Sequence, residues 1–234
     1  MPQLIVALDV ASAQEAEHLV DALYELDVIF KVGMEPLYGY GDRLFAYFEA
    51  RDVRHFIDAK LHDIPRTVAA AVRQLVRQGT HIINVHALGG AAMMRAAVEA
   101  AVQRAAELPV SPPPHVFAVT VLTSMDARDL QAVGLSGDAS ANALRLARLA
   151  KDAGCAGVVC SAHEVQSIKA ALGTDFLALT PGIRPADDEA RDQKRVATPQ
   201  QAVRAGADYL VVGRPVTEAA DPLAAAKSVL EAMR

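Results

Sequence analysis

Short apolar runs alternate with longer amphipathic segments from one end of the chain to the other. The short runs are rich in aliphatic and β-branched side chains, which is typical of buried strands. Eight of them are expected as strands, at 4–8, 28–30, 55–57, 81–85, 116–122, 157–160, 176–179 and 209–212. Apolar residues at helical spacing predict a first helix that Ser12 caps, with Ala16, Leu19, Val20 and Leu23 on its apolar face. Further helices are expected from Gly33 to about Ala50, and at 68–77, 91–107, 127–133, 139–153 and 222–233.

Eight strand–helix units in succession predict a parallel sheet, because each strand is followed by a segment long enough to cross back. Eight units also suit closure into a (β/α)8 TIM barrel, an α/β fold that we expect to fill residues 1–234 as a single domain. A doubly wound open sheet is the structural alternative, although no GxGxxG follows the first strand. The prolines at 112–114 are expected in a loop and not at a domain boundary.

Composition and net charge limit the partners and the location that we expect for this chain. A net charge of −5 without long basic runs argues against nucleic acid, and the lack of a stretch of about 18 apolar residues argues against a membrane span. The first strand begins almost at Met1, which leaves no room for a signal peptide, so we expect a cytoplasmic protein. Cys155 and Cys160 are expected as small buried residues, and no metal-binding cluster of Cys or His is visible.

The stretch from Asp58 to Thr67 concentrates charge directly after an apolar run. Asp58 and Lys60 should point to one side of a strand, because side chains repeat every second residue. Asp63 and Thr67 follow on the loop and first helical turn. Charges forced together at a strand end mark catalytic sites, although a solvated strand end with Asp63 as a helix N-cap is the plainer alternative.

Unusual polar residues, Asp58 and Lys60 among them, fall at the ends of several predicted strands. In a barrel these strand ends form one face, and that face carries the active site. The polar residues are Asp9, Lys31, Asp58, Lys60, Thr123, Arg184 and Arg214. Gly182 and Gly213 beside the two arginines suit a phosphate-binding site, with ordinary turns as the alternative. The polar loop 185–196 suits either a closing lid or a solvated connection. His62 and His86 are expected to be packing residues.

Four motifs resemble orotidine 5′-phosphate decarboxylases, in the right order along nearly the whole chain. They are Asp-x-Lys-x-x-Asp-Ile-Pro-x-Thr at 58–67, Leu-Thr-Ser at 122–124, Pro-Gly-Ile-Arg at 181–184 and Val-Gly-Arg-Pro at 212–215. Asp9, Lys31 and Gln193 match further positions of that family. Arg66 stands where the family commonly has Asn, which affects contacts near Thr67.

The resemblance implies decarboxylation of orotidine 5′-monophosphate to uridine 5′-monophosphate, with neither metal nor organic cofactor. Lys60, Asp58, Asp63 and Lys31 would be the catalytic residues, with Lys60 stabilising and then protonating the C6 carbanion. The substrate-binding residues would be Asp9, Lys31, Thr67, Thr123, Ser124, Arg184, Gln193, Gly213 and Arg214. The enzyme would be a homodimer in which Asp63 and Thr67 reach the partner's site.

Two other functions remain open from the sequence. A Mg2+-dependent sugar-phosphate decarboxylase or aldolase of the same superfamily shares Asp-x-Lys-x-x-Asp, but it would carry an acid where Lys31 stands. A non-catalytic phosphate-binding barrel would be expected to lack one of the charged residues, whereas Lys31, Asp58, Lys60 and Asp63 are all present.

Overall fold

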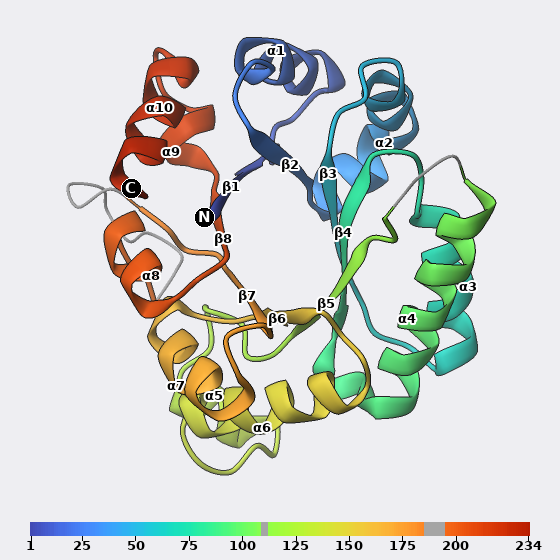
Figure 1. Cartoon of the computed structure of the whole chain (residues 1–234), viewed down its shortest axis with the longest axis vertical. Coiled ribbons are helices and arrows are strands. Elements are labelled where there is room, and N and C mark those ends of the chain that lie inside the picture. The colour runs from blue at the N-terminus through green and yellow to red at the C-terminus, as the bar shows by residue number, and fades with distance from the viewer. Residues whose placement is uncertain (109–111, 185–194) are drawn as a thin grey trace.

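The computed structural model describes residues 1–108, 112–184 and 195–234 as a closed ring of eight parallel strands surrounded by helices (Figure 1). The strands pair in sequence order, and β8 pairs with β1 to close the ring. They are β1 (Gln3–Ala7), β2 (Val28–Val32), β3 (His55–Leu61), β4 (Thr80–His86), β5 (His115–Val119), β6 (Gly157–Val159), β7 (Leu177–Thr180) and β8 (Tyr209–Val212). The predicted TIM barrel is confirmed.

Helices follow the strands around the outside of the ring. They are α1 (Ala13–Leu23), α2 (Met34–Glu49), α3 (Pro65–Leu75), the 3-10 turn η1 (Ala87–Gly89), α4 (Gly90–Glu107), α5 (Ala127–Ala132), α6 (Ala139–Asp152), α7 (Ala162–Leu172), α8 (Pro199–Ala205), α9 (Arg214–Thr217) and α10 (Pro222–Ala232). Ser12 caps α1 by accepting from the Glu15 amide, as predicted. No helix in the described ranges is both long and apolar enough to cross a membrane.

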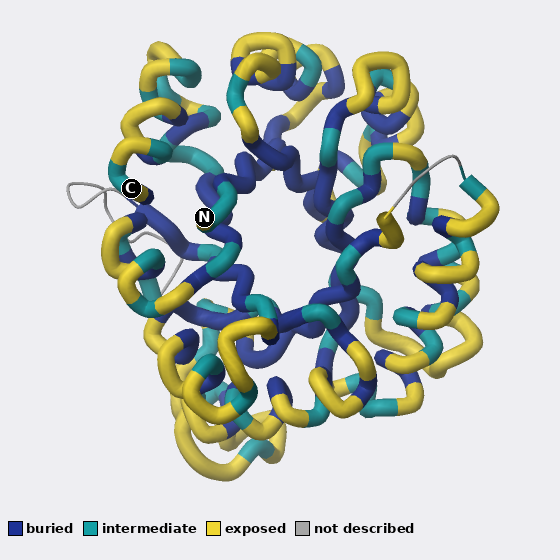
Figure 2. The backbone as a smooth tube through the Cα atoms, in the orientation of Figure 1, coloured by how far each residue is buried: buried dark blue, intermediate teal, exposed yellow. Residues whose placement is uncertain are grey.

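Alternation along the strands divides the core into two layers. In β1, Leu4 and Val6 pack outward against the helices, whereas Ile5 and Ala7 point into the barrel. The inner layer continues around the ring with large apolar side chains, so the barrel is filled at its base. These inner residues are Ile29, Phe56, Ile82, Phe117, Leu179, Tyr209 and Val211. Figure 2 shows the result: the strands are largely buried, and exposed residues concentrate on the helices.

Three element boundaries differ from the prediction by three or more residues. β3 continues to Leu61, so Asp58 and Lys60 lie inside the strand and not after it. β5 ends at Val119 and not at Leu122, and its last residue paired with β6 is Val119 itself. The helix expected at 68–77 begins at Pro65, whose fixed φ suits a first helical position.

Candidate active site

Polar side chains replace apolar ones on the inward face of the first four strands, one step above the filled base. Each polar residue lies two positions after an inward apolar residue, as Lys31 does after Ile29 and Asp58 after Phe56, so the pleat aims it into the barrel. The four positions are Asp9, Lys31, Asp58 and Asn84. The convergence expected from the sequence therefore has a simple geometric cause.

Acid and base alternate along these side chains. The Lys31 ammonium lies 3.0 and 3.1 Å from the two Asp9 carboxylate oxygens and 3.3 Å from Oδ2 of Asp58. Oδ1 of Asp58 accepts from the Lys60 ammonium at 2.7 Å. The result is a continuous row, Asp9–Lys31–Asp58–Lys60, whose four formal charges cancel.

The two middle members of the row are buried, and their neighbours keep them ionised. Burial opposes ionisation of Asp58, but the charges of Lys31 and Lys60 hold its pKa below the ordinary value. Burial likewise works against the Lys31 ammonium, yet Asp58 and Asp9 raise its pKa above the ordinary value. The alternating charges of the row therefore keep Lys31 and Asp58 ionised in a buried site that would otherwise favour their neutral forms.

A buried amide joins the row from β4. Asn84 is fully buried; its Nδ2 donates to Oδ1 of Asp58 at 2.7 Å and its Oδ1 accepts from the Lys60 backbone amide at 2.7 Å. Lys60 has a φ of 48°, in the left-handed region that non-glycine residues rarely adopt. Asn84 was missed by the sequence reasoning, although it follows inward Ile82 by the same two-residue step.

Gly33 makes room for the first ion pair. A Cβ at this position would lie 2.5 Å from Oδ1 of Asp9 and 2.9 Å from Nζ of Lys31. Because both atoms belong to the charged row, any larger residue would push the pair apart.

The row forms one wall of a cavity of about 710 Å3 at the mouth of the barrel. Arg184, Gly213 and Arg214 line it from the ends of β7 and β8, across the ring from β3. Thr123 and Ser124 line it from the loop after β5. The volume lies within the usual range for small-molecule sites. Nine predicted residues thus share one cavity.

Two other predicted residues do not line this cavity. Asp63 and Thr67 are exposed at the start of α3. The N-cap alternative for Asp63 is wrong: α3 is capped by Ile64 without a side-chain bond, and Asp63 Oδ1 instead accepts from the adjacent Ile64 amide at 2.6 Å. Gln193 lies outside the described residues, as does most of the loop 185–196, for which the sequence left either a lid or a solvated connection open.

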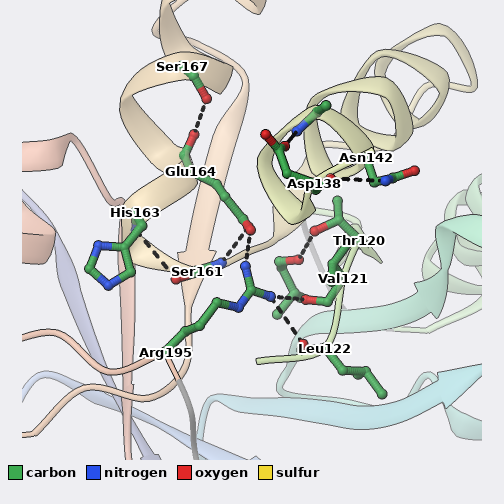
Figure 3. Close-up of polar contacts among 12 residues, drawn as sticks. Thr120, Val121, Leu122, Asp138, Asn142, Ser161, His163, Glu164, Ser167 and Arg195 are labelled. Atoms are coloured by element: carbon green, nitrogen blue, oxygen red, sulfur yellow. Dashed lines mark hydrogen bonds and ion pairs between the residues drawn. The ribbon is translucent and has the colours of Figure 1, made fainter. Parts of the chain in front are cut away.

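A second buried ion pair supports the rim of the cavity (Figure 3). The Arg195 guanidinium binds the carboxylate of fully buried Glu164, and its Nη2 donates to the carbonyls of Val121 and Leu122 at 3.2 and 3.1 Å. The other Glu164 oxygen accepts from the Ser161 amide at 2.9 Å. Arg195 thereby fixes the backbone just before Thr123, a role that no local sequence pattern indicated.

In the described residues, the histidines and cysteines make no hydrogen bond or ion pair with the charged row. The rings of His62 and His86 stack at 5.3 Å, as expected for packing residues, and burial lowers the pKa of His86 to about 4. Cys155 and Cys160 are buried and free. In the three described ranges, His, Cys, Asp and Glu form no group of three or more suited to a metal ion.

Comparisons with known proteins identify the family of this chain. A family model described as "Orotidine 5'-phosphate decarboxylase / HUMPS family" matches residues 2–229. The chain belongs to that family. The chain is therefore an enzyme of the carboxy-lyase class.

Relatives named orotidine 5′-phosphate decarboxylase cover almost the entire chain. The protein of Shewanella sediminis (strain HAW-EB3) is 46% identical over 98% of this chain and 96% of its own length. That of Moorella thermoacetica is 46% identical over 97% and 90%. Among solved structures, the orotidine 5′-phosphate decarboxylase of Lactobacillus acidophilus has a TM-score of 0.88 at 34% identity and covers both chains fully. An uncharacterized conserved protein from Geobacillus kaustophilus has a TM-score of 0.85 at 38% identity, covering 99% of this chain and 100% of its own.

Proposed function

We propose that the chain decarboxylates orotidine 5′-monophosphate to uridine 5′-monophosphate and CO2, using its own side chains without a metal or organic cofactor. The observation that carries this proposal is the Lys60 ammonium, held 2.7 Å from buried Asp58 inside a cavity that has two arginines across the barrel. The names of the relatives agree with it.

The reaction breaks the bond between C6 and the carboxylate and leaves the electron pair on C6. No electron sink is available on the ring, so a preorganised cation is the stabilising element that an enzyme can supply. Lys60 provides that cation and then transfers a proton from Nζ to C6, after which solvent reprotonates the amine. Asp58 holds Lys60 in place, and Asp9 with Lys31 binds the ribose hydroxyls.

The far side of the cavity suits the phosphate. Arg184 and Arg214 offer planar forks of donors, and Gly213 lets the backbone approach an anion. Thr123 and Ser124 lie between the phosphate side and the charged row and would face the pyrimidine. Gln193 is assigned to the same phosphate end. Binding energy from this remote group then contributes to the rate of the chemical step.

Lys31 favours this reaction over a Mg2+-dependent one in the same superfamily. Its ammonium lies between the carboxylates of Asp9 and Asp58, at 3.0 and 3.3 Å. A divalent cation drawn to the same two carboxylates would meet this positive charge.

The active unit is a homodimer. Asp63 and Thr67 are exposed and lie outside the cavity of their own chain, which suits contribution to a partner's site. Mixing Lys60→Ala chains with Asp63→Ala chains tests this directly. If Asp63 acts across the interface, half of the randomly formed dimers carry one intact site, and the mixture recovers about a quarter of wild-type activity. If Asp63 serves its own chain, the mixture recovers none.

The decisive experiment follows the absorbance change of orotidine 5′-monophosphate after treatment with a chelator. We expect turnover to persist without metal, and Lys60→Ala to abolish it while the nucleotide still binds. Lys169→Ala is a matched control, because Lys169 also makes a 2.7 Å pair with an aspartate, Asp208, but away from the cavity. Activity that requires added Mg2+, or that survives in Lys60→Ala, would refute the proposal.

A further inference from the structure

Asn84 makes two short hydrogen bonds with two residues of the charged row. Its amide group has no alternative orientation, because a flip would set Nδ2 against the Lys60 N–H and Oδ1 against the Asp58 carboxylate. The side chain is fully buried on β4, so water does not compete for either bond.

The bond to Lys60 accompanies an irregularity in β3. Two register shifts interrupt the pairing of β3 with β4, one between His55 and Phe56 and a second between Ile57 and Leu61. Lys60 lies within the second shift at a φ of 48°, a conformation unfavourable for a residue with a side chain. Its amide donates to the Asn84 side chain, so Asn84 stands in for the missing ladder partner.

The hydrogen bond from Asn84 to Asp58 holds the other member of the Lys60–Asp58 ion pair. Oδ1 of Asp58 receives both the Asn84 amide and the Lys60 ammonium, each at 2.7 Å. One amide therefore determines both the backbone from which Lys60 projects and the carboxylate oxygen to which its ammonium is bound.

We propose that Asn84 is a positioning residue that holds Lys60 and Asp58 in the geometry needed for proton transfer. This inference rests on the proposed decarboxylation. Without Asn84, the Lys60 backbone can relax toward an ordinary strand conformation, which moves the base of its side chain. Asp58 also loses one of the donors that hold its carboxylate.

The effect should appear in kcat and not in KM. Asn84 lies on β4, whereas Arg184 and Arg214 line the cavity from the other side of the ring. A displacement of the reacting group by about 1 Å can cost about 100-fold in rate. For Asn84→Ala we expect kcat to fall by about 10- to 100-fold, with KM within about twofold of wild type.

Asn84→Asp separates positioning from simple packing, because it keeps the shape and the acceptor for Lys60. Its new carboxyl group would face Asp58 at the distance where two carboxylates share one proton, which raises the pKa of the pair. Protonated, it can donate to Asp58; ionised, it repels Asp58. We therefore expect kcat to be highest at acid pH and to fall between acid and neutral pH, a range in which wild type should show no such fall.

Other charged groups around position 84 do not mimic this fall in kcat. Lys31 on β2 and Lys60 on β3 both carry positive charge, and the β5 residue paired with Asn84 is the uncharged Phe117. His86, next but one on β4, has its pKa lowered to about 4, mainly by burial, so it stays neutral across the assay range.

Asn142→Asp is the matched control. Asn142 is also buried, on α6, where its Nδ2 donates to the carbonyls of Ser136 and Asp138. This substitution perturbs folding to a similar degree but should leave the pH profile of kcat unchanged.

The experiment measures kcat and KM against pH with orotidine 5′-monophosphate for wild type and the three variants. A wild-type enzyme that does not turn over this substrate refutes the proposed function before any variant is compared. With wild type active, an unchanged kcat in Asn84→Ala, a loss confined to KM, or a pH-independent loss in Asn84→Asp overturns the role of Asn84. If Asn84→Ala does not fold, the profile of the isosteric Asn84→Asp still decides.

Discussion

Replacing Arg195 by methionine would leave a carboxylate without its cation in the protein interior. Methionine keeps much of the aliphatic length but neither binds Glu164 nor donates to the Val121 and Leu122 carbonyls (Figure 3). Because Glu164 is fully buried, removal of one partner of such a pair costs about 3–5 kcal/mol. The Val121 carbonyl, on a buried residue, adds about 1 kcal/mol when it loses its donor.

The destabilisation should depend on pH in a defined direction. Burial raises the pKa of Glu164 above its ordinary value, with Arg195 pulling the other way. Loss of Arg195 raises that pKa further. A folded-state pKa above the unfolded one favours the fold only at low pH and penalises it as pH rises. The gap between Arg195→Met and wild type should therefore be smaller at about pH 5 than at about pH 8.

Urea unfolding followed by circular dichroism at the two pH values measures both effects. A double variant, Arg195→Met with Glu164→Gln, supplies the control: an amide can still accept from the Ser161 N–H but carries no charge, so the double variant should be more stable than Arg195→Met alone by about 2 kcal/mol. A loss under about 1 kcal/mol, or the same loss at both pH values, would contradict the assignment of a buried charge pair.

Two further predictions concern acid stability and the phosphate site. Burial lowers the pKa of His55 to about 4 from 6.5, so the unfolded chain binds more protons between these values, and His55 alone should contribute about 3 kcal/mol to the fall in the free energy of unfolding as pH drops from 6.5 to 4. Urea unfolding over this range measures the fall, and a His55 ring that titrates near 6.5 by NMR would rule it out. Arg214→Ala should lower kcat/KM for orotidine 5′-monophosphate but leave the slow reaction of orotidine, which has no phosphate, unchanged; equal losses on both substrates would disprove the phosphate contact.

Most of the fold could be predicted from hydrophobic periodicity, because a barrel repeats the same strand–helix pattern eight times. The alternation that marks Ile5 and Ile29 as inward also places the polar residues that follow them. The same rule would have selected Asn84, two residues after Ile82, but an asparagine inside an apolar run attracts less attention than a charged residue. Asp58 and Lys60 do lie together as predicted, although regular strand geometry is not the reason, since Lys60 departs from it.

The parts of the site that the sequence pattern did not predict depend on contacts between residues far apart in the chain. Arg195 and Glu164 are 31 residues apart, and two of the other acceptors of Arg195 are backbone carbonyls that no side-chain pattern records. Those carbonyls belong to the segment wrongly expected to extend β5. The partner-directed roles of Asp63 and Thr67 stay predictions, because they depend on contacts between two chains.

The left-handed backbone at Lys60 sets backbone strain against charge pairing at a single position. A side chain in this conformation costs about 1–2 kcal/mol relative to a residue that adopts it freely. Glycine at position 60 would relieve that strain while removing the ammonium. The same change would remove a cation paired with buried Asp58, and that loss opposes the relief of strain, so a substitution that measures the strain alone must keep the positive charge.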